Sequence, residues 1–475
     1  MPLNIDVDSS FITITIYVTT TTIPAELRPY LEIYMESFFS LPLNVETEDG
    51  ERKQLTYEEV VSELNKDTVS YTYSLGVNGS FEEMVCLQIK VEASKYENGI
   101  RWLRNLLWNT EFTAERLKIC ATKLFNDIPQ SKRDGYSMSA TVLQLIHYDP
   151  AKSNKYALSV LNQEKVLPNT IQLLDDDPDR VIEEFYRLRK ILTSPENFRV
   201  HVIGDILKLN QPKTSWIDNF KIIPDIKHLS PVPSARDVLT EYGRHPGNKG
   251  YVIELSAIEN QIKLYANISN AYTLNEKFFI KIGPTTYDSP DLAPLLVLCE
   301  LLHTMEGIFW RLIRGQGLAY SVGLKVGVES GHIYLTIYRS PDSYKAYDQA
   351  RQAVHDLAER KIEFDKSGLD GAKCGVIYGL VKSESNNQRA ASESFALQVL
   401  KNVDPTYNRI LISKVQDVNI DDLYEMLSKY IINLFLPGSS SVVVVSAPGK
   451  VEDVREGFNS HGFKLDVKNL NDVLE

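Results

Sequence analysis

The sequence has little cysteine, no long apolar run and no excess of positive charge. None of the four cysteines among its 475 residues forms a CxxC pair, so there is neither a zinc ribbon nor a thiol redox motif. No apolar run reaches the ~18 residues of a membrane-spanning helix, and the longest, LAPLLVLCELL, predicts a buried helix. The net charge of −12 argues against nucleic acid or membrane as a partner, because both favour a basic surface.

The common catalytic motifs are also missing. There is no GxSxG nucleophile elbow and no GxxxxGK[ST] phosphate loop. The closest approach to a zinc motif is HTMEG, which would be an inverted HxxEH motif if Gly307 were histidine. Because one ligand is lacking, we interpret His303 as a core or surface histidine and expect no metal site in this chain.

The sequence does contain a repeated order of predicted elements. Each half predicts a strand, helices, a strand pair, a long helical region, a further helix and a final strand. In the first half these are expected at 11–20, 23–41 with 56–65, 68–77 with 83–93, 98–128, 179–192 and 198–205. A capping-box pattern, Thr56-xx-Glu59, opens the helix at 56–65. In the second half they are expected at 260–268, 290–305 with 307–315, 318–327 with 332–340, 343–383, 420–436 and 439–448.

Two short segments tie the halves together. EFTAERL begins at Glu111 and EFDKSGL begins at Glu363, and they match at Glu, Phe and Leu with one offset, 363 − 111 = 252. A proline-rich stretch lies between the halves and breaks regular structure. We therefore predict two homologous α+β domains, 1–215 and 245–475, joined by a linker at 216–244. Each domain is expected to be a mainly antiparallel sheet with helices on one face.

The segment WRLIRGQGLAYSVGL places Arg314 at the end of a helical pattern and Tyr320 at the start of a strand. Glycines between them allow a sharp turn, so both side chains could face one cleft. A guanidinium offers fork-like donors to a carbonyl or carboxylate, and a phenol can donate to an oxyanion. The alternative is a surface arginine and a cross-strand tyrosine with no chemical role.

The repeat helps to decide whether Arg314 and Tyr320 have a chemical role. It aligns Tyr71 with Tyr320, but the residue six positions before Tyr71 is Asn65, and the glycines are absent. A purely structural pair would be expected in both halves. Only the second half has the arginine and the glycine-rich turn, and we interpret this difference as a specialisation of that half.

At these residues the sequence resembles the fourth domain of the pitrilysin-family metallopeptidases, in particular the presequence-protease-like branch. The resemblance rests on FWRLIRGQGLAYSVGL followed by GHIYLTIYRSPD. Residues 1 to about 215 are similar to the third domain of that family, mainly in the order of their elements. The resemblance implies four homologous domains in two halves that close around a chamber, with HxxEH and zinc in the first domain.

The resemblance thus implies a C-terminal half whose zinc is held by a separate N-terminal half, in the same polypeptide or in another subunit. Arg314 would hold substrate, and Tyr320 would donate to the tetrahedral oxyanion. The substrate would be an unfolded peptide, and we expect a cytoplasmic protein, with the mitochondrial matrix as the alternative. The rival interpretation is a structural or substrate-holding subunit with this fold and no peptidase role.

Overall fold

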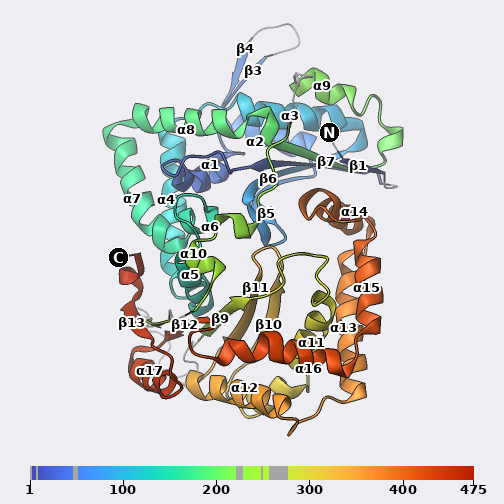
Figure 1. Ribbon diagram of the computed structural model, residues 1–475. Coiled ribbons are helices and arrows are strands. Elements are labelled where there is room, and N and C mark those ends of the chain that lie inside the picture. The colour runs from blue at the N-terminus through green and yellow to red at the C-terminus, as the bar shows by residue number, and fades with distance from the viewer. Residues whose placement is uncertain are drawn as a thin grey trace, which may run out of the picture.

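The structure is a computed structural model that describes residues 3–6, 9–46, 52–220, 228–247, 250–255 and 276–474. It confirms the predicted α+β fold, with one large sheet in each half of the chain and the first sheet lying above the second in the view of Figure 1. The strands of the first half are β1 Leu3–Asp6, β2 Phe11–Thr19, β3 Leu43–Glu46, β4 Arg52–Leu55, β5 Ser70–Val77, β6 Ser80–Glu92 and β7 Phe198–Gly204. Those of the second half are β8 Gly250–Glu254, β9 Glu276–Ile282, β10 Ser321–Gly327, β11 His332–Tyr338, β12 Ser441–Ser446 and β13 Asp466–Asn469.

The two large sheets share one strand order. Sheet 1 runs β5-β6-β2-β7-β1, and sheet 2 runs β10-β11-β9-β12-β8 with β13 added at its far edge. The pairs β1–β7 and β8–β12 are parallel, whereas the strands before them in each order pair antiparallel. An antiparallel hairpin, β5–β6 or β10–β11, therefore forms the corresponding edge of each sheet.

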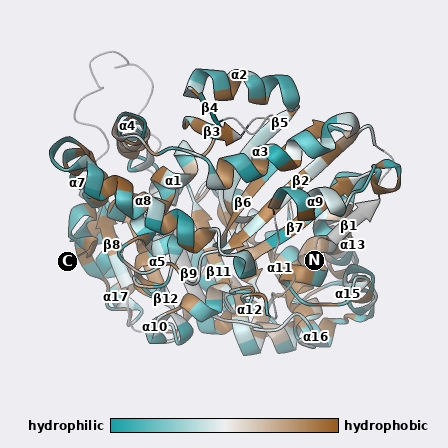
Figure 2. Ribbon diagram, turned by 90° about the horizontal axis from the view of Figure 1, so that it is seen from above, coloured by the Kyte–Doolittle hydropathy of each residue, from teal (hydrophilic) through white to brown (hydrophobic). Residues whose placement is uncertain are grey.

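Helices cover the outer face of each sheet and connect its strands (Figures 1 and 2). All the helices of the first half are α1 Leu31–Ser37, α2 Tyr57–Asp67, α3 Tyr96–Trp108, α4 Ala114–Ser131, α5 Gly135–His147, α6 Asn154–Ala157, α7 Val160–Asp176, α8 Pro178–Leu192 and α9 Thr214–Phe220 in the described ranges. After these come α10 Glu241–Arg244, α11 Leu292–His303, α12 Ser343–Ala358, α13 Lys366–Ser383, α14 Asn387–Phe395, α15 Tyr407–Asp417, α16 Ile420–Met426 and α17 Val451–Ser460. No helix in these described ranges combines the length and apolar character needed to cross a bilayer.

The helix caps repeat with the offset seen in the sequence. Thr113 caps α4 and Asp365 caps α13, and 365 − 113 = 252. Asp134 caps α5 and Asn386 caps α14, and 386 − 134 = 252. In all four caps the side chain accepts a backbone N–H of the first turn, which satisfies a donor that the helix leaves unpaired. The repeat therefore extends to equivalent helix starts.

The equivalent helices α5 and α14 cross to the opposite half. On β12, Val442 and Val444 face the second half's own core, whereas Val443 and Val445 pack against α5 of the first half. Conversely, Phe395 at the end of α14 inserts against sheet 1 of the first half. Each sheet thus has its inner face covered by a helix from the other half, and this exchange holds the halves together.

Some predicted elements differ from the structure. The strand predicted at 260–268 lies outside the described residues, and the strand that occupies the position equivalent to β2 is β9. The helix predicted over 23–41 is shorter, with a 3-10 turn at Arg28–Tyr30 followed by α1. By contrast, the capping box of Thr56 and Glu59 is present at the start of α2.

The segment predicted as a linker carries local structure. Trp216 on α9 packs into the core of the first half, and its indole N–H donates to the Tyr96 hydroxyl at 2.7 Å. Further along, α10 packs on the end of α5, where a Cβ at Gly243 would lie 2.1 Å from the His147 carbonyl oxygen. Glycine is therefore required at that contact.

His201 lies at the contact between the halves and provides a test of it. Its ring stacks on Phe395 with centroids 4.6 Å apart, it is 1% exposed, and within the described residues neither ring nitrogen has a hydrogen-bond partner. Burial lowers the pKa of His201 to about 4. Because an unfolded histidine titrates near pH 6.5, the unfolded state takes up the proton first, and stability falls as the pH drops from about 6.5 towards 4.

We expect His201→Phe to reduce this pH dependence. The loss that His201 contributes is on the order of 2 kcal/mol at pH 5, and phenylalanine cannot titrate, so the variant should gain stability relative to the parent at pH 5. Urea unfolding at pH 7 and pH 5 measures the effect. His332→Phe provides a comparison. Burial also lowers the pKa of His332 to about 4, so this variant should reduce the pH dependence as well. It should in addition destabilise at both pH values, because His332 Nε2 lies 2.7 Å from the Gly243 carbonyl oxygen and that contact is lost. An unchanged pH dependence in His201→Phe would contradict the expectation.

Candidate functional site

The helical segment that ends at Arg314 is not the regular helix that the sequence predicted, because its last turn is wider. Trp310–Arg314 is a π-helical turn, in which the Gly315 N–H donates to the Trp310 carbonyl at 2.7 Å. Gly317 then takes φ +71°, a backbone conformation that favours glycine. Tyr320 precedes the first residue of β10, so the strand begins later than predicted.

The turn brings the two predicted site residues together. The Arg314 guanidinium carbon lies 4.9 Å from the centroid of the Tyr320 ring, within the range of a cation–π contact. Arg314 is exposed, and Tyr320 is 57% exposed. In the described part of the chain, the Tyr320 hydroxyl has no hydrogen-bond partner. The phenol is therefore available to a ligand.

Two further tyrosines extend the pair into a row. The Tyr320 ring meets the Tyr338 ring edge-on with centroids 6.2 Å apart, and Tyr338 meets Tyr136 in the same way at 6.0 Å. We call Arg314, Tyr320, Tyr338 and Tyr136 the tyrosine row. Tyr136 comes from α5 of the first half, and no local signal in the sequence connects it with the other three.

Tyr71, which the repeat aligns with Tyr320, has a different environment. It is half-buried in β5 and packs on Phe39 with ring centroids 4.7 Å apart. The aligned tyrosine of the first half is thus a packing residue, whereas Tyr320 is exposed.

A small cavity adjoins Arg314. Its volume is about 230 Å³, and it is lined by Arg314, Phe309, Val322 and the end of α11, including Glu300 and His303. His303 Nδ1 lies 2.8 Å from the Val322 carbonyl oxygen, so this ring is tied to the start of β10. Among the described residues, no group of three or more histidine, cysteine, aspartate or glutamate side chains is placed to hold a metal ion.

A larger groove lies between the halves beside the tyrosine row. Its volume is about 600 Å³, and both halves line it. Tyr136 and Gln144 on α5 form one side, the β5–β6 turn closes one end, and residues 323–327 of β10 form the other side. We call this cavity the β10 groove. Because Tyr136 belongs both to its lining and to the tyrosine row, the groove leads towards Arg314 and Tyr320.

Charged side chains hold together the end of the β10 groove at which the β5–β6 turn lies. Glu329, in the turn after β10, accepts the Phe81 N–H at 2.9 Å and the Ala235 N–H at 2.8 Å. Burial raises the pKa of the Glu329 carboxyl, although both N–H donors act in the opposite direction. Lys155 and Glu82 form an ion pair at 3.2 Å nearby. The tips of the hairpins β5–β6 and β10–β11 are thereby joined.

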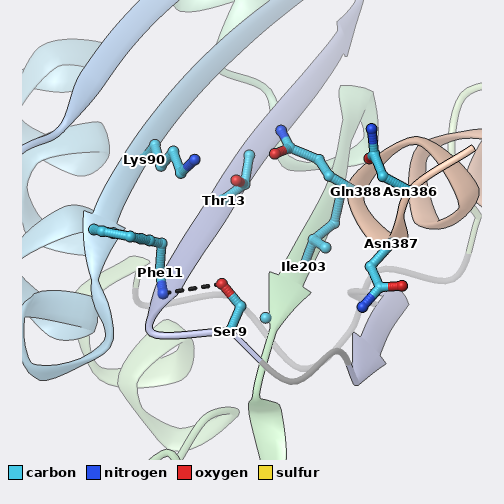
Figure 3. A pocket seen from close by; sticks show the side chains of 9 residues that line it. Ser9, Phe11, Thr13, Lys90, Ile203, Asn386, Asn387 and Gln388 are labelled. Carbon is cyan, nitrogen blue, oxygen red and sulfur yellow. Dashed lines mark hydrogen bonds between the residues drawn. The ribbon is translucent and has the colours of Figure 1, made fainter.

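Another cavity, of about 440 Å³, lies on sheet 1. Figure 3 shows Phe11, Thr13 and Lys90 on one side and Asn386 and Gln388, at the start of α14, on the other. Its lining contains neither residue of the Arg314–Tyr320 pair.

Sequence comparison finds relatives of greater length. The chain is 30% identical to an uncharacterised protein of Schizosaccharomyces pombe over 98% of its own length and 44% of the relative. It is 28% identical to an uncharacterised protein of Saccharomyces cerevisiae, with the same coverage of both. The chain therefore spans less than half the length of these curated relatives. No model of a known protein family matches it.

Solved structures define the class of fold. A protease from Helicobacter pylori aligns with a TM-score of 0.66 and 12% identity, over 93% of this chain and 96% of that one. A peptidase M16 inactive domain from Pseudomonas fluorescens gives 0.63 and 12%, over 94% of each. The periplasmic protease PqqL of Escherichia coli gives 0.61 and 12%, over 93% of this chain and 43% of that one. The chain thus has the fold of the M16, or pitrilysin-like, peptidases.

Proposed function

We propose that this chain is the C-terminal half of a zinc metallopeptidase of the presequence-protease-like type and degrades unfolded peptides together with an N-terminal half. The exposed contact between Arg314 and Tyr320 is the observation that carries the proposal. The M16 fold supports the proposal. The greater length of the relatives supports it too, because a protein of that length has room for an N-terminal half in addition to a chain like this one. Zinc would belong to that other half, where it would polarise the scissile carbonyl and activate water.

Tyr320 would act on the substrate oxygen. In peptide hydrolysis the carbonyl oxygen gains negative charge as the tetrahedral intermediate forms, and a donor placed at that oxygen stabilises the transition state more than the ground state. The Tyr320 hydroxyl is such a donor, since it is exposed and unoccupied within the described residues. Its ring is held from one side by Tyr338, which limits the positions that the hydroxyl can reach.

Arg314 would both hold Tyr320 and bind the substrate. Its guanidinium lies over the ring of Tyr320 and restrains it by a cation–π contact. The N–H groups of the planar guanidinium can meanwhile donate to a substrate carbonyl. Placing both groups on one turn keeps the carbonyl-binding donor and the oxyanion donor at a fixed separation. A fixed geometry of this kind lowers the cost of ordering the reactants.

The two halves of the complete protein would enclose the substrate. A closed chamber admits an unfolded peptide and excludes a folded protein, and opening of the halves would then gate turnover. The cytoplasm, or alternatively the mitochondrial matrix, would supply such peptides. The alternative role, a structural or substrate-holding subunit, would use the same surface for binding without hydrolysis.

We expect the purified chain to lack peptidase activity on its own. A quenched fluorescent peptide library should remain intact with the chain, whereas the complete protein should cleave it. A zinc chelator should abolish that cleavage, and added zinc should restore it, because the metal would lie in the other half.

Robust chelator-sensitive cleavage by the chain alone would defeat the proposal. Failure of the zinc-loaded complete protein to cleave any peptide in the library, while it still binds some of them, would instead favour the substrate-holding role.

A further inference from the structure

A polar groove lies against the inner face of sheet 1, beside α14. Thr13 of β2 pairs with Lys90 of β6 and with Ile203 of β7, so these three side chains form one row across the sheet. The residues on either side of Thr13 in β2 belong to the core of the first half. Because side chains alternate along a strand, the row lies on the opposite face, towards α14.

Two cavities join to form this groove. The cavity of about 440 Å³ lies between the Thr13 row and the start of α14 (Figure 3). A further cavity, of about 590 Å³, continues along α14 and the end of α13. Asn386 and Gln388 line both cavities. We call the joined cavities the α14 groove, and the side chains that give it its chemistry are Asn78, Lys90, Lys382, Asn386, Gln388 and Arg389.

The α14 groove is the counterpart of the β10 groove in the repeat. Gln388 of α14 and Tyr136 of α5 line the two grooves and differ by the offset of the repeat, 388 − 136 = 252. Ser392 and Ala140 show the same relation, 392 − 140 = 252. Each groove thus lies between a sheet and the helix that crosses to it from the other half. The aromatic side chain of one groove is an amide in the other, so the two grooves offer different chemistry.

Cations line the α14 groove. Lys90 lies on sheet 1, Lys382 lies in the last turn of α13, and Arg389 lies in the first turn of α14. Among the described residues, none of these three has a carboxylate at ion-pair distance. The one carboxylate of the described lining, Glu393, already pairs with Lys401 at 3.2 Å. In a chain whose net charge is −12, this local excess of positive charge favours an anionic ligand.

Aromatic rings hold two of these cations without neutralising them. The Lys90 ammonium nitrogen lies 5.2 Å from the centroid of the Phe11 ring, and that of Lys382 lies 5.6 Å from the Tyr378 ring. Both distances are within the range of a cation–π contact. Because a ring carries no net charge, the positive charge of each lysine remains available to a carboxylate.

Amide side chains suit the α14 groove to a peptide. Asn78, Asn386, Asn387 and Gln388 all line it. The Asn386 side-chain oxygen accepts the Arg389 N–H at 3.0 Å, which leaves the NH₂ group of Asn386 to donate to a ligand. A primary amide both donates and accepts hydrogen bonds, as a peptide group does. The lining therefore complements a peptide with carboxylate side chains better than it complements inorganic phosphate.

The β5–β6 turn connects the α14 groove with the β10 groove. Asn78 lines the α14 groove, whereas the next two residues, Gly79 and Ser80, line the β10 groove. The two grooves therefore meet at this turn. A peptide that lies in the β10 groove, next to the tyrosine row, reaches the α14 groove by passing over the turn.

We propose that the α14 groove holds an acidic segment of the peptide substrate, several residues away from the bond placed at Arg314 and Tyr320. This inference rests on the proposed function and adds a second recognition site to it. The carboxylates of the segment pair with the cations of the groove, and its backbone pairs with the amide side chains. The preferred substrates are therefore unfolded peptides that carry a cluster of aspartate or glutamate beside the cleaved segment.

The preference can be measured with matched pairs of peptides. Both members of a pair carry the same quenched cleavage segment, a glycine–serine spacer and a short tail, which is all glutamate in one and all glutamine in the other. One pair has the tail at the amino end and another has it at the carboxyl end. With the complete protein, the glutamate tail should lower KM about tenfold in one of the pairs and change kcat little, because it adds binding far from the reacting bond. Equal KM values for both tails in both pairs would overturn the inference.

Variants that remove charge locate the preference. Lys382→Gln combined with Arg389→Gln should reduce the tenfold preference to about twofold or less. Lys366→Gln combined with Arg409→Gln is the matched control and should keep the preference, because Lys366 lies at the other end of α13 and Arg409 lies on α15, both outside the lining. All four side chains are exposed, so both double variants should fold. A preference that survives Lys382→Gln with Arg389→Gln would overturn the inference.

Salt distinguishes a peptide from a phosphate ligand. Sodium chloride should reduce the preference for the glutamate tail, since exposed charges are screened. Sodium phosphate at equal ionic strength should reduce it to the same extent. Selective displacement of the glutamate tail by phosphate would assign the α14 groove to a phosphate ligand and overturn the inference.

The outcome can be separated from that of the proposed function. Binding of the tailed peptides to Tyr320→Phe, measured by fluorescence anisotropy, should keep the preference, because Tyr320 lies outside the α14 groove. Cleavage by the complete protein without a tail preference would reject the α14 groove and retain the catalytic proposal. A tail preference in binding to a complete protein that cleaves no peptide would retain the α14 groove in a substrate-holding protein.

Discussion

In the complete protein, Tyr320→Phe should lower kcat by a factor of about 10² to 10³, the usual cost of removing one oxyanion donor, with little change in KM. The substitution deletes only the hydroxyl, so the ring remains in place for the contacts with Arg314 and Tyr338. An interaction made only in the transition state affects turnover rather than ground-state binding. Steady-state kinetics on a single quenched peptide measures both parameters.

Tyr71→Phe is the matched control for this experiment. Tyr71 is the aligned tyrosine of the first half, and its environment is the packing contact with Phe39. Its hydroxyl has no part in the proposed chemistry, so kcat should be unchanged. If Tyr320→Phe raised KM and left kcat as it was, Tyr320 would belong to the substrate-binding wall and not to the oxyanion site.

Features encoded by neighbouring residues could be predicted from the sequence. The capping box at Thr56 and Glu59 was recognised because both partners lie in one turn of chain. The turn between Arg314 and Tyr320 was recognised because glycine marks a change of direction, and Gly317 does adopt positive φ there. The repeat was recognised because EFTAERL and EFDKSGL share Glu, Phe and Leu at one offset, and in the structure both segments open equivalent helices.

Features that depend on distant contacts could not be predicted. The exchange of α5 and α14 between the halves was missed, because the segment NQRAASESF of α14 is polar and shows no apolar stripe. Its anchoring residue, Phe395, is recognisable only from its position between Tyr17 and His201. Tyr136 was missed for the same reason, since its place in the tyrosine row depends on α5 crossing to the second half.

The exchange of helices explains how a site in the second half can depend on the first. The tyrosine row ends on Tyr136 of α5, and the β10 groove is closed by α5 and by the β5–β6 turn. Glu329 joins that turn to the end of β10 through the N–H of Phe81. The position of β10 relative to the first half is therefore set by several contacts spaced along the groove.

The fold of the first half depends on a buried arginine, and Arg28→Met should lower the free energy of unfolding by about 3–5 kcal/mol. Arg28 is 2% exposed. Its guanidinium donates to the Asn154 side-chain oxygen at 2.8 Å and to the carbonyls of Ala151 and Thr20, both at 3.1 Å. It also lies 3.4 Å from a Glu83 oxygen. Methionine fills similar space but cannot donate, so the Asn154 side-chain oxygen and the Ala151 carbonyl lose the N–H groups that Arg28 supplies. Urea unfolding measures the loss.

The pH dependence of the stability lost in Arg28→Met distinguishes the effect of the missing charge from the effect of lost packing. Burial raises the pKa of Glu83 to about 7, so Glu83 favours the folded state below pH 4.5 and that contribution is lost as the pH rises towards 7. Without Arg28 the buried carboxylate is paired with no cation of the described residues. The difference in stability between variant and parent should therefore be wider at pH 8 than at pH 5. An equal gap at both pH values would mean that lost packing, and not charge, causes the destabilisation.

Two further variants complete this test. Arg187→Met removes an exposed arginine that pairs with Glu26 at 2.9 Å, and it should cost less than about 1 kcal/mol, as surface ion pairs usually do. Adding Glu83→Gln to Arg28→Met removes the charge that was left unpaired, so the double variant should be more stable than the two single losses together predict. Strict additivity would show that Arg28 and Glu83 act independently, and the buried ion pair would then not be what stabilises this half.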